Sequence, residues 1–137
     1  MADDEISEDE CWLLLRAERI GRFAIESAGG PQIFPVNYVV RDRAIWFRSA
    51  PGEKVAQSAA HPRAAFEIDG RDGDEFWSVV VDGAVSILDD SDPHTTEALA
   101  NLVSLHPSPK HMVVSIAVDR ISGRRFRPRH PAGLWGG

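Results

Sequence analysis

Three side chains in the stretch FRSAPGEK, residues 47–54, have the chemistry of an anion site: Arg48, Ser49 and Lys54. An apolar run precedes the stretch and an alanine-rich run follows it, so it joins a predicted strand to a predicted helix. Two cations, a hydroxyl and the free N–H groups of a helix start can converge there on a phosphate, and Gly52 permits close approach. A solvated turn is the commoner use of such a stretch, so both interpretations stay open.

Two further segments offer groups that could hold the rest of such a ligand. PVNY, residues 35–38, is predicted on the strand that pairs with AIWFRS, and Pro35 indicates an edge, a bulge or the approach of a group other than a strand. Trp77 provides a large flat surface and Ser78 a hydroxyl. A ligand with a phosphate at one end and a planar ring at the other could use all of these groups. Core packing of Trp77 and an edge hydrogen bond of Asn37 are the ordinary alternatives.

Composition and missing motifs argue against several classes of function. Neither G-x-G-x-x-G nor a P-loop is present, and no nucleophile elbow marks a serine hydrolase. The five histidines are scattered, so we predict no metal site. A net charge of −6 argues against general nucleic-acid binding, and no apolar run is long enough to cross a membrane. With a single cysteine and no basic-then-apolar start, we expect a cytoplasmic location.

Charge is distributed unevenly along the chain. Acidic side chains crowd residues 3–10, whereas arginines crowd residues 120–129. Two solvated segments would explain this pattern as well as a basic end that faces an anionic ligand or partner.

The periodicity of apolar residues predicts nine elements in the order helix, three strands, helix, two strands, helix, strand. The predicted helices cover residues 7–17, 52–61 and 93–105, and the predicted strands cover residues 20–27, 32–41, 44–49, 63–69, 76–90 and 111–128. Ser7 with Glu10 indicates a capping box, and Gly83 indicates a bulge or bend. We expect the strands 32–41 and 44–49 to form a hairpin, and residues 70–75 to form a loop.

These elements favour a mainly β protein with short helices. Strands that come in hairpins and long twisted runs fit an antiparallel sheet that curls into a small barrel better than a parallel α/β sheet. The chain of 137 residues is predicted to form one domain, with residues 1–6 and 129–137 as flexible tails.

Several patterns together resemble one known family. PVNY, FRSAPGEK, FEID and WSVVVDGAV, with ISGRRF near the end, are similar to the pyridoxamine 5′-phosphate oxidase-like family of FMN-binding split β-barrel proteins, from about Trp12 to Phe126. The resemblance implies a six-stranded antiparallel split barrel with FMN as cofactor. It also implies a homodimer with two flavins at the interface, each contacted by both chains.

The resemblance also implies roles for individual residues. Arg48, Ser49 and Lys54 would hold the FMN phosphate, and Trp77 and Ser78 would approach the cofactor from the other subunit. The residues expected to border the isoalloxazine ring are Pro35, Val36, Asn37, Tyr38 and Phe47. No catalytic side chain is assigned, because flavin chemistry does not require an acid or a base.

One departure from the family limits the function that we predict. The end RRFRPRHPAGLWGG does not reproduce the arginine-containing segment that binds the substrate phosphate in pyridoxamine phosphate oxidases. Our leading hypothesis is therefore an FMN-binding oxidoreductase that acts on another small molecule. The alternatives are a non-catalytic flavin- or haem-binding module, a reductase that uses a 5-deazaflavin coenzyme, and a cofactor-free scaffold.

Overall fold

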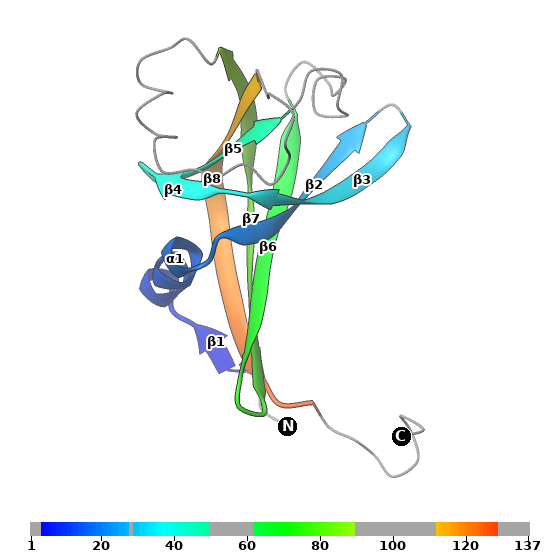
Figure 1. The fold of residues 1–137 in the computed structure, drawn as a ribbon. Helices are drawn as coiled ribbons and strands as arrows, with labels where there is room; N and C mark the ends of the chain where they lie inside the picture. Colours follow the sequence, from blue (N-terminus) through cyan, green and yellow to red (C-terminus); the bar gives the residue numbers. More distant parts are fainter. Residues whose placement is uncertain (1–3, 28, 50–61, 90–111, 129–137) are drawn as a thin grey trace.

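The computed structural model describes residues 4–27, 29–49, 62–89 and 112–128. Within these ranges the chain forms one helix and an eight-stranded antiparallel sheet (Figure 1). The elements are β1 Asp4–Ile6, α1 Glu8–Ala17, β2 Ile20–Ser27, β3 Gly30–Asn37, β4 Val39–Arg41, β5 Ala44–Ser49, β6 Arg63–Asp72, β7 Glu75–Asp89 and β8 Met112–Phe126. Several predictions fall on residues outside these ranges, so the structure does not describe them. They concern the helices over 52–61 and 93–105, Lys54, the tail 129–137 and the five histidines.

Helix α1 begins and packs as its sequence predicts. The backbone N–H of Glu10 donates to the Ser7 hydroxyl at 3.2 Å, which satisfies one of the unpaired donors of the first turn. Cys11, Trp12 and Leu15 form the buried stripe of the helix. Among the described residues, no helix is long and apolar enough to cross a membrane.

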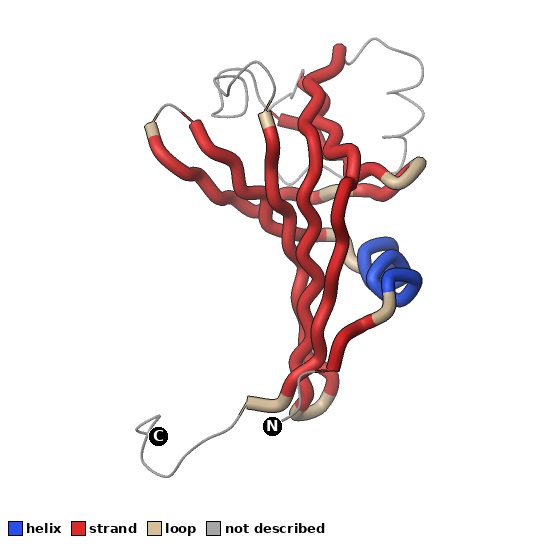
Figure 2. Tube along the Cα trace, turned by 180° about the vertical axis from the view of Figure 1, so that it is seen from behind, coloured by secondary structure: helices blue, strands red, loops and turns tan. Residues whose placement is uncertain are grey.

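The sheet curls because its two ends are consecutive in the chain. Its hydrogen-bonded order is β3-β2-β6-β7-β8-β5-β4, and Tyr38 alone separates β3 from β4. Figures 1 and 2 show β6, β7 and β8 running the length of the molecule, while β2–β3 and β4–β5 splay across its upper half. The predicted split-barrel architecture is confirmed, although the described part of the sheet has eight strands instead of six.

The structure divides the predicted strand 32–41 into two strands. The predicted hairpin with residues 44–49 therefore forms over only part of the predicted length. β3 pairs with β2, and only β4 pairs with β5. Asp42 and Arg43 connect β4 and β5 with φ angles of 54° and 57°, as a two-residue type I′ turn requires. β3 is an edge strand, which confirms the edge position that Pro35 indicated.

Tyr38 leaves the strand because both of its polar groups bond to other parts of the chain. Its N–H donates to the carbonyl of Arg19 at 3.0 Å, and its hydroxyl donates to the carbonyl of Leu15 at 2.6 Å. Leu15 lies in the last turn of α1, where carbonyls have no partner within the helix. The joint between β3 and β4 therefore also caps α1.

The β6–β7 connection is shorter than predicted, and the bulge lies where it was expected. The predicted loop 70–75 is wrong, because β6 continues to Asp72 and β7 starts at Glu75, with Gly73 at a φ of 65° in the turn. The register of β7 with β8 shifts between Asp82, which pairs with Arg120, and Gly83, which pairs with Val118. The extra residue is therefore Asp119 on β8.

The two ends of opposite charge lie against each other. Residues 4–6 form β1, which pairs with β8, so the prediction of a flexible tail is wrong for them. Asp4 lies opposite Arg125 and Glu5 opposite Arg124, and Arg125 forms an ion pair with Glu10 of α1. The acidic segment therefore neutralises part of the basic strand within one chain.

Aromatic rings fill the inside of the curl next to the joint. Phe23 contacts Phe34 and Phe47, with ring centroids 5.4 and 4.9 Å apart. The rings of Tyr38 and Phe66 form a T-shaped pair with centroids 4.9 Å apart. A Cβ at Gly21 would lie 2.2 Å from Cζ of Phe66, so the ring occupies the space that a side chain at position 21 would need.

We expect Gly21→Ala to lower the free energy of unfolding by about 1 to 3 kcal/mol, because the added methyl group overpacks the space under Phe66. Urea unfolding followed by tryptophan fluorescence measures the change. Gly29→Ala is the matched control: its Cβ would meet nothing within 4 Å, so the change should stay within about 0.5 kcal/mol of zero or be slightly stabilising. Equal effects of the two substitutions would contradict this packing.

We expect Tyr38→Phe to lower the free energy of unfolding by about 1 to 2 kcal/mol, because the Leu15 carbonyl loses its donor in a buried place. Tyr38→Ala also removes the ring contact with Phe66, so its cost should be clearly larger. Urea unfolding of both variants separates the hydroxyl from the ring. A phenylalanine variant as stable as the wild type would show that the capping bond contributes nothing.

Candidate functional site

Strand alternation sorts the predicted cofactor residues into two groups. Four of them belong to the hydrophobic core, with almost no exposed surface: Val36, Tyr38, Phe47 and Trp77. Because these side chains are buried, a ligand bound at the surface of the chain can contact these four residues only through their backbone. Burial also raises the pKa of Tyr38, which keeps its hydroxyl protonated as a donor to Leu15.

Three other residues of the predicted set face away from the main core. Pro35 and Asn37 alternate with the core residues of β3, and Ser78 lies between buried Trp77 and Val79 on β7. Arg48 is half-buried and shares its face of β5 with Trp46, which packs in a second buried cluster. We call the sheet surface that carries Pro35, Asn37 and Ser78 the outer face. Ser49 pairs with Met112 through its backbone; its side chain and the whole of Lys54 lie outside the described structure.

One chain brings only some of these residues together. Val80 lies two positions from Ser78 on β7 and therefore points to the same face. Pro35 and Val80 stand in one row of paired residues that runs across β3, β2, β6 and β7. Three strand spacings, roughly 14 Å, separate them. Arg48, by contrast, lies opposite Val113 on β8, whereas Ser78 lies opposite Arg124, eleven positions farther along. At about 3.3 Å per residue, up to roughly 36 Å of strand separates them.

A cluster of charged side chains that the sequence patterns did not predict lies between Pro35 and Ser78. Arg22 of β2 bonds to Glu67 at 2.7 Å and to Asp69 at 2.8 Å, both on β6. Arg22 is the register partner of Pro35, and Asp69 is the register partner of Ser78. We call Arg22, Glu67 and Asp69 the outer triad. Alternation in GRFAI and FEID places these side chains opposite the core residues of their strands, but the pairing of β2 with β6 is needed to bring them together.

The pKa of Glu67 lies above its ordinary value. The main cause is burial of its carboxyl, and a hydrogen bond with Asp69 adds to the effect, while Arg22 acts in the opposite direction. Two carboxyl groups share one guanidinium here, so the triad carries one excess negative charge when both are ionised.

Exposed apolar side chains surround the outer triad. Ile33 is 67% exposed, Ile20 47% and Val80 45%, and all three belong to the strands that carry or flank the triad. Large aliphatic side chains grouped around a few polar ones are typical of a surface that another molecule covers.

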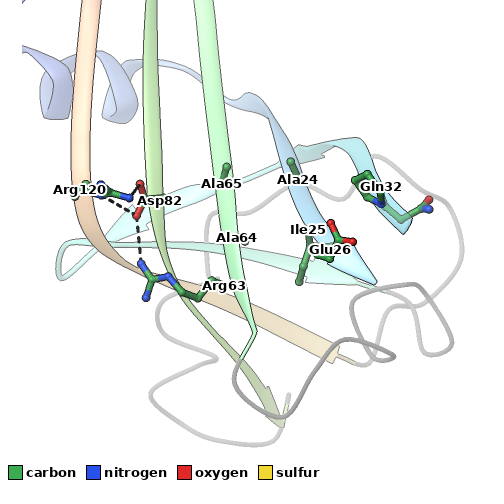
Figure 3. Close-up of a pocket in the computed structure, with 10 residues that line it drawn as sticks. Ala24, Ile25, Glu26, Gln32, Arg63, Ala64, Ala65, Asp82 and Arg120 are labelled. Atoms are coloured by element: carbon green, nitrogen blue, oxygen red, sulfur yellow. Dashed lines mark hydrogen bonds and ion pairs between the residues drawn. The ribbon is translucent and has the colours of Figure 1, made fainter. Parts of the chain in front are cut away.

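A groove lies next to the triad on the same sheet. It has a volume of about 380 Å³, and Ala24 and Ala65, which are register partners, contribute its small side chains (Figure 3). Figure 3 also shows Asp82 between two arginines: Arg63 contacts it at 3.2 Å and Arg120 at 3.0 Å. None of the described residues of the predicted cofactor set lines this groove.

Comparison with known proteins matches most of the chain to one family. A family model described as pyridoxamine 5′-phosphate oxidase matches residues 7–125. An uncharacterized protein of Mycobacterium tuberculosis is 33% identical over 90 residues, which are 65% of this chain and 81% of that protein.

Two solved structures share both fold and sequence with the chain. The FAD-binding protein from Mycobacterium smegmatis is 31% identical with a TM-score of 0.73, over 90% of this chain and 100% of that one. A FAD-binding protein from Mesorhizobium loti is 28% identical with a TM-score of 0.76, over 92% and 99% of the two chains. The likeness to these two proteins therefore extends over nearly the whole chain.

The charges of the outer triad predict opposite effects of two substitutions on Glu67. Asp69→Asn should lower the pKa of Glu67, because a neighbouring negative charge is lost, and Arg22→Gln should raise it, because the cation is lost. Carboxyl-carbon NMR titration measures both.

The same shift predicts the sign of the effect on stability. Because the folded-state pKa of Glu67 is raised above the ordinary 4.5, its stabilising contribution is present below that value and is lost as pH rises through the folded pKa. Asp69→Asn should bring the folded-state pKa of Glu67 closer to its ordinary value. The pH range over which the free energy of unfolding changes because of Glu67 should then be narrower, which urea unfolding at a series of pH values measures. A Glu67 pKa that neither substitution moves would contradict the coupling.

Proposed function

The chain belongs to the pyridoxamine 5′-phosphate oxidase family, and from this membership we propose that it is a flavin-binding oxidoreductase acting on a small molecule. The observation on which the proposal rests is the likeness to the FAD-binding protein from Mycobacterium smegmatis over 90% of this chain. A bound flavin supplies hydride or electron transfer, so the chain itself has to bind, orient and shield it.

The chemistry of the described residues fits such a ligand. Arg48, at the end of β5, has a planar guanidinium suited to phosphate oxygens, and in the proposal it acts with Ser49 and Lys54. Pro35 and Asn37 lie on the outer face of the edge strand β3. The backbone of this strand and the amide of Asn37 can form hydrogen bonds with the polar rim of the isoalloxazine ring. Val36, Tyr38, Phe47 and Trp77 support these positions from the core.

We propose FMN or FAD as the flavin. FMN follows from the family resemblance, and FAD from the likeness to the two FAD-binding proteins. Both have an isoalloxazine ring and at least one phosphate, so the same residues would serve either of them.

We further propose a homodimer with one flavin site at each end of the interface. A ligand that touches both Arg48 and Ser78 needs two chains, because up to roughly 36 Å of β8 separates their register partners within one chain. The exposed Ile20, Ile33 and Val80 are apolar surface that a second chain can bury. The buried free thiol of Cys11 agrees with a cytoplasmic location, which we also propose.

Purified protein should be yellow, with a flavin absorbance spectrum, and mass spectrometry of the released chromophore should identify FMN or FAD. Arg48→Ala should weaken flavin binding by roughly tenfold to a hundredfold, because a charge-assisted hydrogen bond to phosphate is lost. Fluorescence titration measures the affinity. Arg16→Ala on α1 removes the same charge at an exposed position away from β5 and should leave the affinity unchanged.

Protein that is colourless and binds neither FMN nor FAD at micromolar concentration would refute flavin binding. Stopped-flow reduction of the bound flavin by NADPH or a reduced 5-deazaflavin separates an oxidoreductase from a storage module, which would show no saturable turnover. Light scattering that gives a monomer would refute the shared site.

A further inference from the structure

Two aromatic rings and an arginine cross the sheet near the turn between β6 and β7. Arg71 of β6 is the register partner of Phe76 of β7, and Phe76 is the register partner of Phe126 of β8. The two phenyl rings are stacked, with centroids 5.9 Å apart and planes inclined by 20°. The guanidinium carbon of Arg71 lies 5.4 Å from the ring centroid of Phe76. We call Arg71, Phe76 and Phe126 the aromatic row.

The aromatic row lies on the outer face, beside Ser78. Phe76 is two positions from Ser78, so about 7 Å of strand separates them and both point to the same side. Trp77 between them points to the other side, where its ring fills the space beside Gly70. Figure 1 shows this end of β6, β7 and β8 at the opposite end of the molecule from the splayed strands β2–β3 and β4–β5.

Arg71 is held in place without being neutralised. Its Nε donates to the carbonyl of Gly73 at 2.6 Å, and its guanidinium lies over the ring of Phe76. No carboxylate of the described residues forms an ion pair with Arg71, whereas Arg22 and Arg63 each pair with two. A guanidinium fixed in this way can donate to phosphate oxygens or to the nitrogens of an aromatic ring.

The chemistry of the aromatic row suits a nucleotide base with an adjoining phosphate. A cross-strand aromatic pair stabilises a sheet in its own right, and a stacked arginine adds to that effect. Phenyl rings and guanidinium planes are also the surfaces on which bases stack. Phe76 and Phe126 are half-buried and Arg71 is exposed, so the row is open to a ligand at the surface.

The position of the aromatic row fits the proposed shared site. In that proposal Ser78 of one chain approaches the flavin whose phosphate is held by Arg48 of the partner subunit. The row belongs to the chain that supplies Ser78, so it lies at the same end of the site. Val80, which the second chain is proposed to bury, is four positions from Phe76, or roughly 14 Å along the strand. The row therefore extends beyond that apolar patch.

We propose that the aromatic row binds the adenosine half of FAD and makes FAD the preferred flavin. The inference rests on the proposed function and goes beyond it, because flavin binding alone does not choose between FMN and FAD. FMN ends at its phosphate, whereas FAD continues through a second phosphate to a ribose and an adenine. In this role the adenine stacks on the row, and Arg71 donates to the second phosphate.

Isothermal titration calorimetry of the full chain with FMN and with FAD tests the inference. Wild-type protein should bind FAD roughly tenfold to a hundredfold more tightly than FMN, which is the range that stacking of one base supplies. Arg71→Gln and Phe126→Leu should each lower this ratio of affinities by roughly tenfold, because each removes one contact of the adenosine half.

Arg127→Gln is the matched control. It removes the same charge at the same end of the sheet, but Arg127 pairs with Asp74 at 3.8 Å, so the ratio should stay that of the wild type. Circular dichroism checks that each variant is folded. Arg71 is exposed, so Arg71→Gln decides the outcome if Phe126→Leu does not fold.

The results separate the inference from the proposed function. Wild-type protein that binds FMN as tightly as FAD would overturn the inference and leave flavin binding intact. A ratio that Arg71→Gln does not change, or that Arg127→Gln changes as much, would also overturn it. Wild-type protein that binds neither FMN nor FAD would refute the proposed function itself.

Discussion

The fold depends on a single residue that belongs to no strand. Tyr38 separates the two strands at the ends of the hydrogen-bonded order, so the sheet has to curl until β3 and β4 meet. Its N–H is bound to Arg19, its hydroxyl to Leu15, and its ring to Phe66. A side chain that offers a donor and an aromatic ring can fix a helix end, a strand break and the core at one point. The curl and the position of α1 are consequently set together.

The inside of this curl is filled by the protein itself. Phe23 contacts Phe34 and Phe47, which lie on two other strands, and Phe66 occupies the space beside Gly21. A small barrel is closed in this way by its own side chains, which leaves the surface of the sheet for ligands. Strand alternation follows this division, because Val36 and Phe47 belong to the core whereas Pro35 and Asn37 face outward from the sheet.

Local patterns in the sequence predicted the parts that depend on local chemistry. The Ser7 cap, the limits of α1, the edge position of Pro35 and the irregularity at Gly83 follow from short-range rules, and they are confirmed. The break at Tyr38 could not be predicted in this way, because its bonding partners are Arg19 and Leu15, which are distant in sequence. Strand β1 was missed for the same reason: a short acidic segment becomes a strand only when β8 offers it a ladder and two arginines. The outer triad was within reach, since alternation places each member, but only the register shows that β2 and β6 are neighbours.

Ion pairs join neighbouring strands at several places on the described surface, and the outer triad differs from the clusters around β1 and the bulge in its balance of charge. At one end, the acidic segment meets the arginines of β8, and around the bulge Asp82 and Asp119 meet Arg63 and Arg120. Balanced pairs of this kind contribute little to stability when exposed, but they allow charged strands to lie side by side without repulsion. At the triad, two carboxyl groups share one arginine amid exposed aliphatic side chains. One carboxylate would be enough to hold β2 against β6, and the second carboxyl group raises the pKa of Glu67 without adding a cation to the cluster.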